Sequence, residues 1–331
     1  MNGADFLNGR LRRVAFLGAA LFLLATMVSP GPLPPEAPPG WAALTAAAVP
    51  LDAENPRRRQ AGALLFRRGW DLDSSDPRFG GISAMHVEDG QVTAISDAGV
   101  LLHFALPPNG PPTGLRVQPL LGGEDDAKAN RDSEAMLIHA GRAWIALERQ
   151  NGVARFRRAD WRFEAGAQPR AMRRWRGNSG AEGMVRLPDG RFLLFAEGRD
   201  NDDPFSDVAL FDRDPTEPGA DALALRYRRI PGFRVTDAAL LPGGRLLVLN
   251  RRLSLFQGVA AKLVVVDVRR LRAGAVLEGR EIADLRPPLT VDNMEALSVT
   301  REGGRTIVRI ASDDNFMALQ RTLLLEFELR E

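Results

Sequence analysis

Short runs of apolar and β-branched residues, separated by glycine, proline, asparagine and aspartate, follow one another along most of the chain. The run ISAMHV at 82–87 is separated from QVTAIS at 91–96 by a turn that contains Asp89 and Gly90. An Asp-Gly pair between two such runs is typical of a tight β-hairpin. Few windows longer than ten residues show a helical period. The pattern therefore predicts an all-β chain.

One short motif recurs along the chain, and each copy is followed by a turn and then by an apolar strand. The copies recur roughly every 50 residues, which is the period of a four-stranded propeller blade. We therefore expect a single β-propeller of five four-stranded blades, and a sixth blade in the long connections stays open. The copies are GGISAM at 80–85, DSEAML at 132–137, GAEGMV at 180–185, VTDAAL at 235–240 and NMEALS at 293–298, aligned on Ser83, Glu134, Glu182, Asp237 and Glu295.

The last repeat supplies only three strands before the chain ends, the third of them at 322–329. An apolar run at 63–72 is available as the missing outer strand, and borrowing it would close the ring and remove an exposed edge. In the second repeat the fourth strand is expected at 171–176. The propeller domain is therefore predicted to span residues 61–331.

The N-terminal region has the composition of an export signal. Arg10, Arg12 and Arg13 precede an apolar run at 14–28, and such a run is short for a membrane-spanning helix. No small-x-small cleavage site follows, so residues 1–29 are expected to be a signal peptide or an uncleaved inner-membrane anchor. Residues 30–60, rich in proline, are expected to be a tether. The predicted location is the periplasm or the cell exterior, with or without a tether to the inner membrane.

Composition excludes several classes of function. Lys and Arg total 44 against 42 Asp and Glu, and no basic stripe interleaved with aromatic residues appears, so a nucleic-acid partner is not expected. The chain has no cysteine, which excludes disulfides, thiolate metal sites and lipoprotein anchoring. No GxSxG motif is present, and the three histidines lie on separate predicted strands, so a serine triad has no support.

Carboxylates gather in the loops that would meet at one end of the propeller channel. Like charges that converge in this way stay ionised only with a cation or guanidinium among them. An all-oxygen ligand set favours a hard divalent metal, of which calcium is the first candidate. The predicted metal ligands are Glu134, Glu182 and Glu295, one from each of three repeats. A competing interpretation is that these glutamates only satisfy backbone donors where blades meet.

The loops between the second and third strands carry the remaining candidates. Planar guanidinium groups match phosphate well, so arginines there would hold a small anionic or ester substrate. The predicted catalytic residues are Asp97, Glu148 and Glu197, and the predicted substrate-binding residues are Arg149, Arg199, Arg251, Asn151 and Asn250.

At these residues the chain resembles the bacterial family described as esterase-like activity of phytase, a phytase-like propeller domain. The matching stretches are GGISAM with SDAG at 96–99, DSEAM with ALERQNGVARF at 146–156, the stretch from NSGAEGMV to FAEG at 178–198, and DNMEALSV at 292–299. The family usually has Glu-Gly in these repeats, whereas here only Glu182-Gly183 keeps it. The resemblance implies hydrolysis of a phosphoester or a carboxyl ester.

We therefore expect an exported phytase-like propeller that hydrolyses a phosphoester or another ester with a divalent cation at the channel mouth. Two alternatives stay open at this point. One is a non-catalytic propeller of the cell envelope that binds a ligand or a protein, and the other is a calcium-dependent lactonase-like hydrolase.

Overall fold

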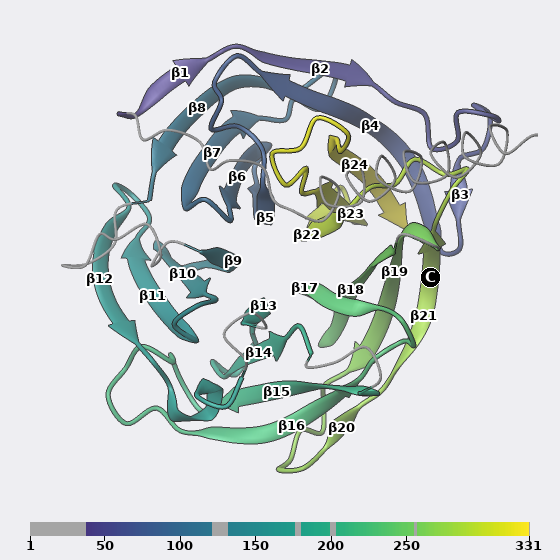
Figure 1. The fold of residues 1–331 in the computed structure, drawn as a ribbon. Helices are drawn as coiled ribbons and strands as arrows, with labels where there is room; N and C mark the ends of the chain where they lie inside the picture. Colours follow the sequence, from purple (N-terminus) through teal and green to yellow (C-terminus); the bar gives the residue numbers. More distant parts are fainter. Residues whose placement is uncertain (1–37, 121–131, 176–179, 199–202, 255–256, 331) are drawn as a thin grey trace, which may run out of the picture.

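A computed structural model describes residues 38–120, 132–175, 180–198, 203–254 and 257–330. The described residues form strands and one 3₁₀ turn, with no α-helix among them. Five small, mainly antiparallel sheets stand around a common centre as the blades of a propeller (Figure 1). The all-β fold and the five-bladed architecture are both confirmed.

Each blade begins at its innermost strand and runs outward along the chain. Blade 1 contains β5 (Ile82–Glu88), β6 (Gln91–Ser96), β7 (Val100–Ala105) and β8 (Thr113–Pro119). Blade 2 contains β9 (Ser133–His139), β10 (Arg142–Leu147), β11 (Gly152–Arg157) and β12 (Arg162–Ala167). Blade 3 contains β13 (Ala181–Arg186), β14 (Phe192–Ala196), β15 (Phe205–Phe211) and β16 (Ala222–Arg228).

The last two blades follow the same order. Blade 4 contains β17 (Arg234–Leu241), β18 (Arg245–Ser254), β19 (Gly258–Asp267) and β21 (Gly279–Leu285). Blade 5 contains β22 (Met294–Glu302), β23 (Arg305–Ser312), β24 (Thr322–Leu329) and, from the N-terminal side, β4 (Leu64–Ser74). Strand β4 runs antiparallel to β24, with Leu72 opposite Thr322 and Leu64 opposite Leu329. The predicted ring closure by the segment at 63–72 is confirmed.

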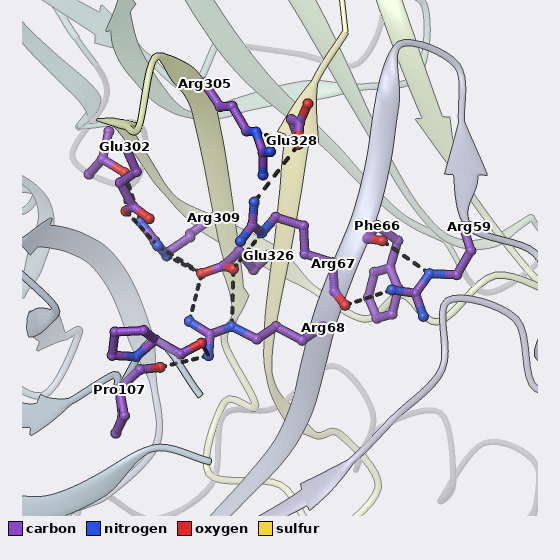
Figure 2. Close-up of polar contacts among 12 residues, drawn as sticks. Arg59, Phe66, Arg67, Arg68, Pro107, Glu302, Arg305, Arg309, Glu326 and Glu328 are labelled. Atoms are coloured by element: carbon purple, nitrogen blue, oxygen red, sulfur yellow. Dashed lines mark hydrogen bonds and ion pairs between the residues drawn. The ribbon is translucent and has the colours of Figure 1, made fainter. Parts of the chain in front are cut away.

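A buried carboxylate holds this closing blade together. Glu326 on β24 is 1% exposed and accepts hydrogen bonds from Arg67 and Arg68 of β4 and from Arg309 of β23 (Figure 2). Arg68 also donates to the carbonyl oxygen of Pro107, in the loop between β7 and β8 of blade 1, at 2.6 Å. The N-terminal strand therefore links the last blade to the first through charge-assisted hydrogen bonds.

Part of the segment that was expected to be a tether, residues 30–60, pairs with the propeller. Strand β1 (Gly40–Ala42) pairs with β8 of blade 1, and β2 (Leu44–Ala48) and β3 (Gln60–Ala61) pair with β4 of blade 5. These strands cover outer edges whose backbone groups would otherwise lack partners. No helix in the described part is long and apolar enough to cross a membrane, and the apolar run at 14–28 lies outside it.

One outer strand differs from the sequence-based expectation. The fourth strand of blade 2 is β12, and the expected strand at 171–176 is wrong: a 3₁₀ turn η2 (Arg170–Met172) stands there instead. Met172 and Trp175 are buried in the apolar cluster between blades 2 and 3, so their apolar character serves packing between blades. A further short strand, β20 (Val276–Leu277), pairs in parallel with β16 of blade 3 rather than with blade 4.

The core lies between the faces of adjacent blades. Between blades 4 and 5, for example, Leu247 and Leu263 belong to the same buried cluster as Phe66 and Phe327, whose rings meet edge-on at 5.6 Å. Because both faces of most blades are covered in this way, polar side chains concentrate in the loops.

Candidate active site

Each innermost strand contains a β-bulge at its copy of the repeated motif. In blade 1 the ladder passes from Ile82 directly to Ala84, so the residue between them has no partner across the sheet. A bulge of this kind re-aims one side chain and is common beside active sites. The five residues passed over in this way are Ser83, Glu134, Glu182, Thr236 and Glu295.

In blade 4 the bulge therefore falls on Thr236, one position before the residue that the sequence alignment placed there. Asp237 is instead paired across the ladder with Leu249. Its carboxylate accepts hydrogen bonds from the backbone of Ala238 and of Leu297 in blade 5, both at 2.7 Å. Asp237 thus joins two blades, as the structural interpretation of the repeat expects.

The two hydroxyl residues at bulge positions also have a structural role. Ser83 Oγ donates to the carbonyl oxygen of Ser133 in the next blade at 2.5 Å, and Thr236 Oγ1 donates to that of Met294 at 3.1 Å. In both cases the acceptor directly precedes the bulged glutamate of the following blade. Blade-to-blade contact through the bulge position is therefore made by hydroxyl groups in blades 1 and 4.

The glutamates at the same position do not repeat this contact. Within the described residues, the side chains of Glu134 and Glu182 make no hydrogen bond or ion pair. Burial, together with the neighbouring carboxylates, raises the pKa of both well above its usual range. Burial therefore disfavours the charged forms of Glu134 and Glu182, and no structural partner offsets this cost. Such an arrangement favours a ligand-binding role for the two glutamates.

Three carboxylates of blade 2 lie close enough to hold one ion. Asp132 precedes β9, Glu134 lies in its bulge and Glu148 follows β10, and one oxygen of each lies within 4.8 Å of the others. The backbone N–H of Glu148 donates to the carbonyl oxygen of Asp132 at 2.9 Å, which holds the two loops together. This group, within one blade, differs from the predicted set of Glu134 with Glu182 and Glu295.

Glu295 belongs instead to an alternating chain of charges across blades 3 to 5. Glu197 contacts Arg234 at 2.8 Å and Arg251 at 3.3 Å, and Arg251 contacts Glu295 at 2.9 Å. Arg251 also donates to Asn293 Oδ1 at 2.6 Å. Burial lowers the pKa of Arg251, but the carboxylates of Glu295 and Glu197 outweigh that effect and raise it overall. This side of the mouth is therefore neutralised by its own arginines, whereas in the blade 2 group Arg149 pairs with Asp132 and, within the described residues, Glu134 and Glu148 make no ion pair.

Asp97, in the loop between β6 and β7, stands between these two parts of the mouth. Its Oδ1 is buried and has no hydrogen-bond partner in the part of the chain that the structure describes. Burial, then the charges of Glu295 and Asp132, raises the pKa of Asp97 to about 7. Burial, then the charges of Asp132 and Glu197, raises the pKa of Glu148 to about 7 as well. Both carboxyls can therefore exchange a proton near neutral pH.

The predicted substrate-binding residues fall in different surroundings. Arg149 is 60% exposed and donates to Asp132 Oδ2 at 2.7 Å, beside the acidic group. Asn151 has a φ of 45° and donates to the carbonyl oxygen of Trp175, so it supports a turn. Asn250 is fully buried and accepts a hydrogen bond from Tyr227 at 3.2 Å, within the interior. Arg199 lies outside the described residues.

The structure brings to this mouth two residues that have no predicted catalytic, metal-binding or substrate-binding role. Asp132 is the first residue of the motif copy DSEAML, two positions before Glu134, and Arg234 directly precedes the motif copy VTDAAL. Their only sequence signal is this position in or beside a repeat.

The profile of the phytase-like family, described as "Esterase-like activity of phytase", matches residues 77–316. The chain belongs to this family. The matched range of this phytase-like propeller contains all five bulge positions but neither β4 nor β24, the strands that close the ring. The family resemblance read from the repeats is confirmed.

No curated protein matches this phytase-like chain. Among solved structures, it is similar to a glutaminyl cyclase of Myxococcus xanthus, with 8% identity, a TM-score of 0.42, and coverage of 75% of this chain and 91% of that chain. It is also similar to an alpha-L-arabinofuranosidase from Clostridium thermocellum, with 11% identity, a TM-score of 0.45, and coverage of 69% and 80% respectively. Similarities this low say nothing about what this chain does.

Proposed function

We propose that this phytase-like propeller is an exported hydrolase of a phosphoester or another ester, which works with a divalent cation at the channel mouth. The observation that carries the proposal is the group formed by Asp132, Glu134 and Glu148, whose oxygens lie within 4.8 Å of one another. Its donors are all carboxylate oxygens, which suit calcium or another hard cation. A cation there would offset the repulsion that raises the pKa of Glu134 and Glu148.

When bound, such a cation supplies Lewis-acid polarisation of the ester group. We assign the proton transfer to Asp97, since its pKa of about 7 lets it accept a proton from water at neutral pH. Glu148 has a pKa of about 7 as well, but its carboxylate would be engaged by the cation. The water oxygen would form a bond to the phosphorus or acyl carbon while the bond to the ester oxygen breaks. The proton held by Asp97 would then pass to the departing oxygen, which restores the carboxylate.

Two arginines are suited to hold the anionic part of the substrate. The side chains of Arg149 and Arg234 are 60% and 39% exposed, and each also contacts a carboxylate of the site. We assign Arg251 a positioning role instead, because its side chain is only 17% exposed and contacts Glu197, Glu295 and Asn293. Glu197, paired with both Arg234 and Arg251, would orient them rather than act as a base.

Export is supported by the basic residues that precede the apolar run at 14–28. A single cysteine introduced as Ala37→Cys should react with a membrane-impermeant thiol reagent in cells whose outer membrane is permeabilised. Because the parent chain has no cysteine, the parent is a clean negative control. Labelling only after lysis would show that the protein is not exported.

The central experiment combines metal titration with a substrate panel. The purified protein is titrated with calcium, magnesium and manganese while its melting temperature is followed, and it is assayed on phosphoesters, carboxyl esters and lactones. We expect a stabilising cation and hydrolysis that depends on it. Glu134→Gln should remove both effects, whereas Glu54→Gln, at an exposed position, should change neither.

Glu182→Gln separates two versions of the metal site. If the cation is held by blade 2 alone, this variant keeps most of the stabilisation, and if it is shared across three blades the variant loses it. A melting temperature that is indifferent to all three cations would exclude the metal site. Cation binding without hydrolysis of any ester would favour a non-catalytic binding propeller, and hydrolysis confined to lactones would favour the lactonase-like alternative.

A further inference from the structure

An aromatic residue in the loop between β23 and β24 is held in an unusual backbone conformation. Asn315 and Phe316 have φ angles of 49° and 51°, a left-handed conformation that bulky residues rarely adopt. Two preceding carboxylates impose it. Asp313 Oδ1 accepts a hydrogen bond from the backbone of Asn315 at 2.6 Å, and Asp314 Oδ1 accepts one from the backbone of Phe316 at 3.0 Å.

The same loop is anchored on blade 1. Asp314 Oδ1 also accepts a hydrogen bond from the backbone of Gly81 at 2.9 Å, and Asp314 Oδ2 accepts one from Thr322 at 2.8 Å. A Cβ atom at Gly81 would lie 2.6 Å from the ring of Phe316 and 2.5 Å from Asp97 Oδ1. The aromatic ring and the candidate general base are therefore neighbours, both packed against a position that only glycine can occupy.

Packing alone is a poor explanation for this arrangement. The fully buried phenylalanines of the core, Phe156, Phe195, Phe211 and Phe327, lie on strands and have ordinary φ angles. Phe316 remains partly exposed, and Leu319 of the same loop is 62% exposed. Backbone strain that surrounding groups enforce at a partly exposed aromatic residue is typical of a functional position. The loop thus presents an apolar surface beside Asp97.

We propose that Phe316 is a specificity-determining residue that contacts an apolar group of the substrate next to the reacting ester bond. The preferred substrate would then carry an aryl or alkyl group there, rather than a phosphorylated polyol. This inference rests on the proposed hydrolase function for its reaction, but the contact itself is a binding interaction. An aromatic ring offers an apolar substituent both buried area and favourable stacking geometry.

Steady-state kinetics test the specificity. The protein is assayed on 4-nitrophenyl phosphate, which has an aryl group, and on glycerol 2-phosphate, which has none. Phe316→Ala should lower kcat/KM for the aryl ester by about tenfold or more, mainly through KM. The same substitution should change kcat/KM for the glycerol ester by less than about twofold. Phe316→Leu should give an intermediate loss. Phe163→Ala, at a 38% exposed aromatic residue on β12, is the matched control and should change neither.

A binding measurement keeps this inference separate from the proposed reaction. Titration calorimetry compares phenylphosphonate with methylphosphonate, neither of which is an ester. The parent protein should bind the phenyl compound about tenfold more tightly, and Phe316→Ala should abolish that preference. If no ester of the full panel of phosphoesters, carboxyl esters and lactones is hydrolysed but this preference is found, the hydrolase proposal fails and the contact stands.

Three results would overturn the role of Phe316: no preference for the phenyl compound in the parent, equal losses for both ligands in Phe316→Ala, or no loss at all. Melting temperatures are measured for every variant. Should Phe316→Ala fail to fold, Phe316→Leu decides the question by the same two ratios.

Discussion

Replacing the candidate general base should make the protein more stable while removing the proposed hydrolytic activity. In Asp97→Asn the buried Oδ1, which has no partner among the described residues, no longer belongs to an ionisable group. Burial together with the charges of Glu295 and Asp132 raises the pKa of Asp97 from an ordinary 3.8 to about 7. Keeping this group charged therefore costs folding free energy, which the neutral amide avoids.

The magnitude follows from that shift. Each pKa unit corresponds to about 1.36 kcal/mol, so a rise of roughly three units sets an upper limit of about 4 kcal/mol at pH 8. The actual gain should be smaller, because neighbouring carboxylates share the repulsion and the amide needs hydrogen bonds of its own. We expect the free energy of unfolding to increase by about 1 to 3 kcal/mol in the absence of divalent cations.

The pH dependence has a defined sign. Between pH 4 and pH 7 the folded protein keeps a proton on Asp97 that the unfolded chain has released. Stability contributed by this group therefore falls as the pH rises through that window and changes little above it. Asp97→Asn should remove up to the contribution of one titrating proton from the pH dependence of the free energy of unfolding. The difference in stability between this variant and the parent should be largest at alkaline pH.

Urea unfolding at several pH values between 4.5 and 8.5, in the presence of a chelator, measures both quantities. Asp160→Asn is the control, because Asp160 is exposed and its pKa is lowered to about 2 by Arg157. It should bring no gain in stability. An Asp97→Asn variant that is no more stable than the parent at pH 8, or that keeps the parent's pH dependence of stability, would show that Asp97 does not carry this cost.

Other predictions concern the joints between blades and are measured by denaturant unfolding. Glu326→Gln should destabilise the fold by about 3 to 5 kcal/mol, because it leaves the buried Arg309 and the half-buried Arg67 and Arg68 without their carboxylate. Arg305→Ala, at a 61% exposed side chain, should cost less than about 1 kcal/mol. Ser83→Ala and Thr236→Val should each cost about 1 kcal/mol and leave cation binding unchanged. Deletion of residues 61–72 should abolish folding, and a deletion variant that melts at the parent temperature would contradict the ring closure.

Much of the architecture could be predicted from local patterns. The two-residue alternation of the strands and the repeated motif depend on neighbours in the chain, so they predict five blades directly. The missing strand of blade 5 follows from the cost of an open sheet edge, which made 63–72 the natural partner of 322–329. Conversely, nothing local distinguishes the strand at Gly40–Ala42 from a proline-rich tether, because its pairing depends on an edge far away in the sequence.

The residue types of the site could be predicted from the sequence, but not which of these residues lie together. The repeats indicate acidic residues at one channel mouth, and there Glu148 does act on Glu134, while Glu295 and Asp132 act on Asp97. The bulge decides which residue of each repeat is re-aimed, and in blade 4 it selects Thr236 instead of Asp237.

Only the tertiary structure shows which charges are already neutralised. Arg251 looked like a residue for holding an anion, yet Glu197 and Glu295 from two other blades engage it. Phe316 carries no sequence signal, since its position beside Asp97 depends on a loop of blade 5 crossing to a glycine of blade 1. Strand patterns arise from short-range sterics and burial and can be read along the chain. The charge balance of a mouth built from five blades depends on distances between residues far apart in sequence, which only the closed ring sets.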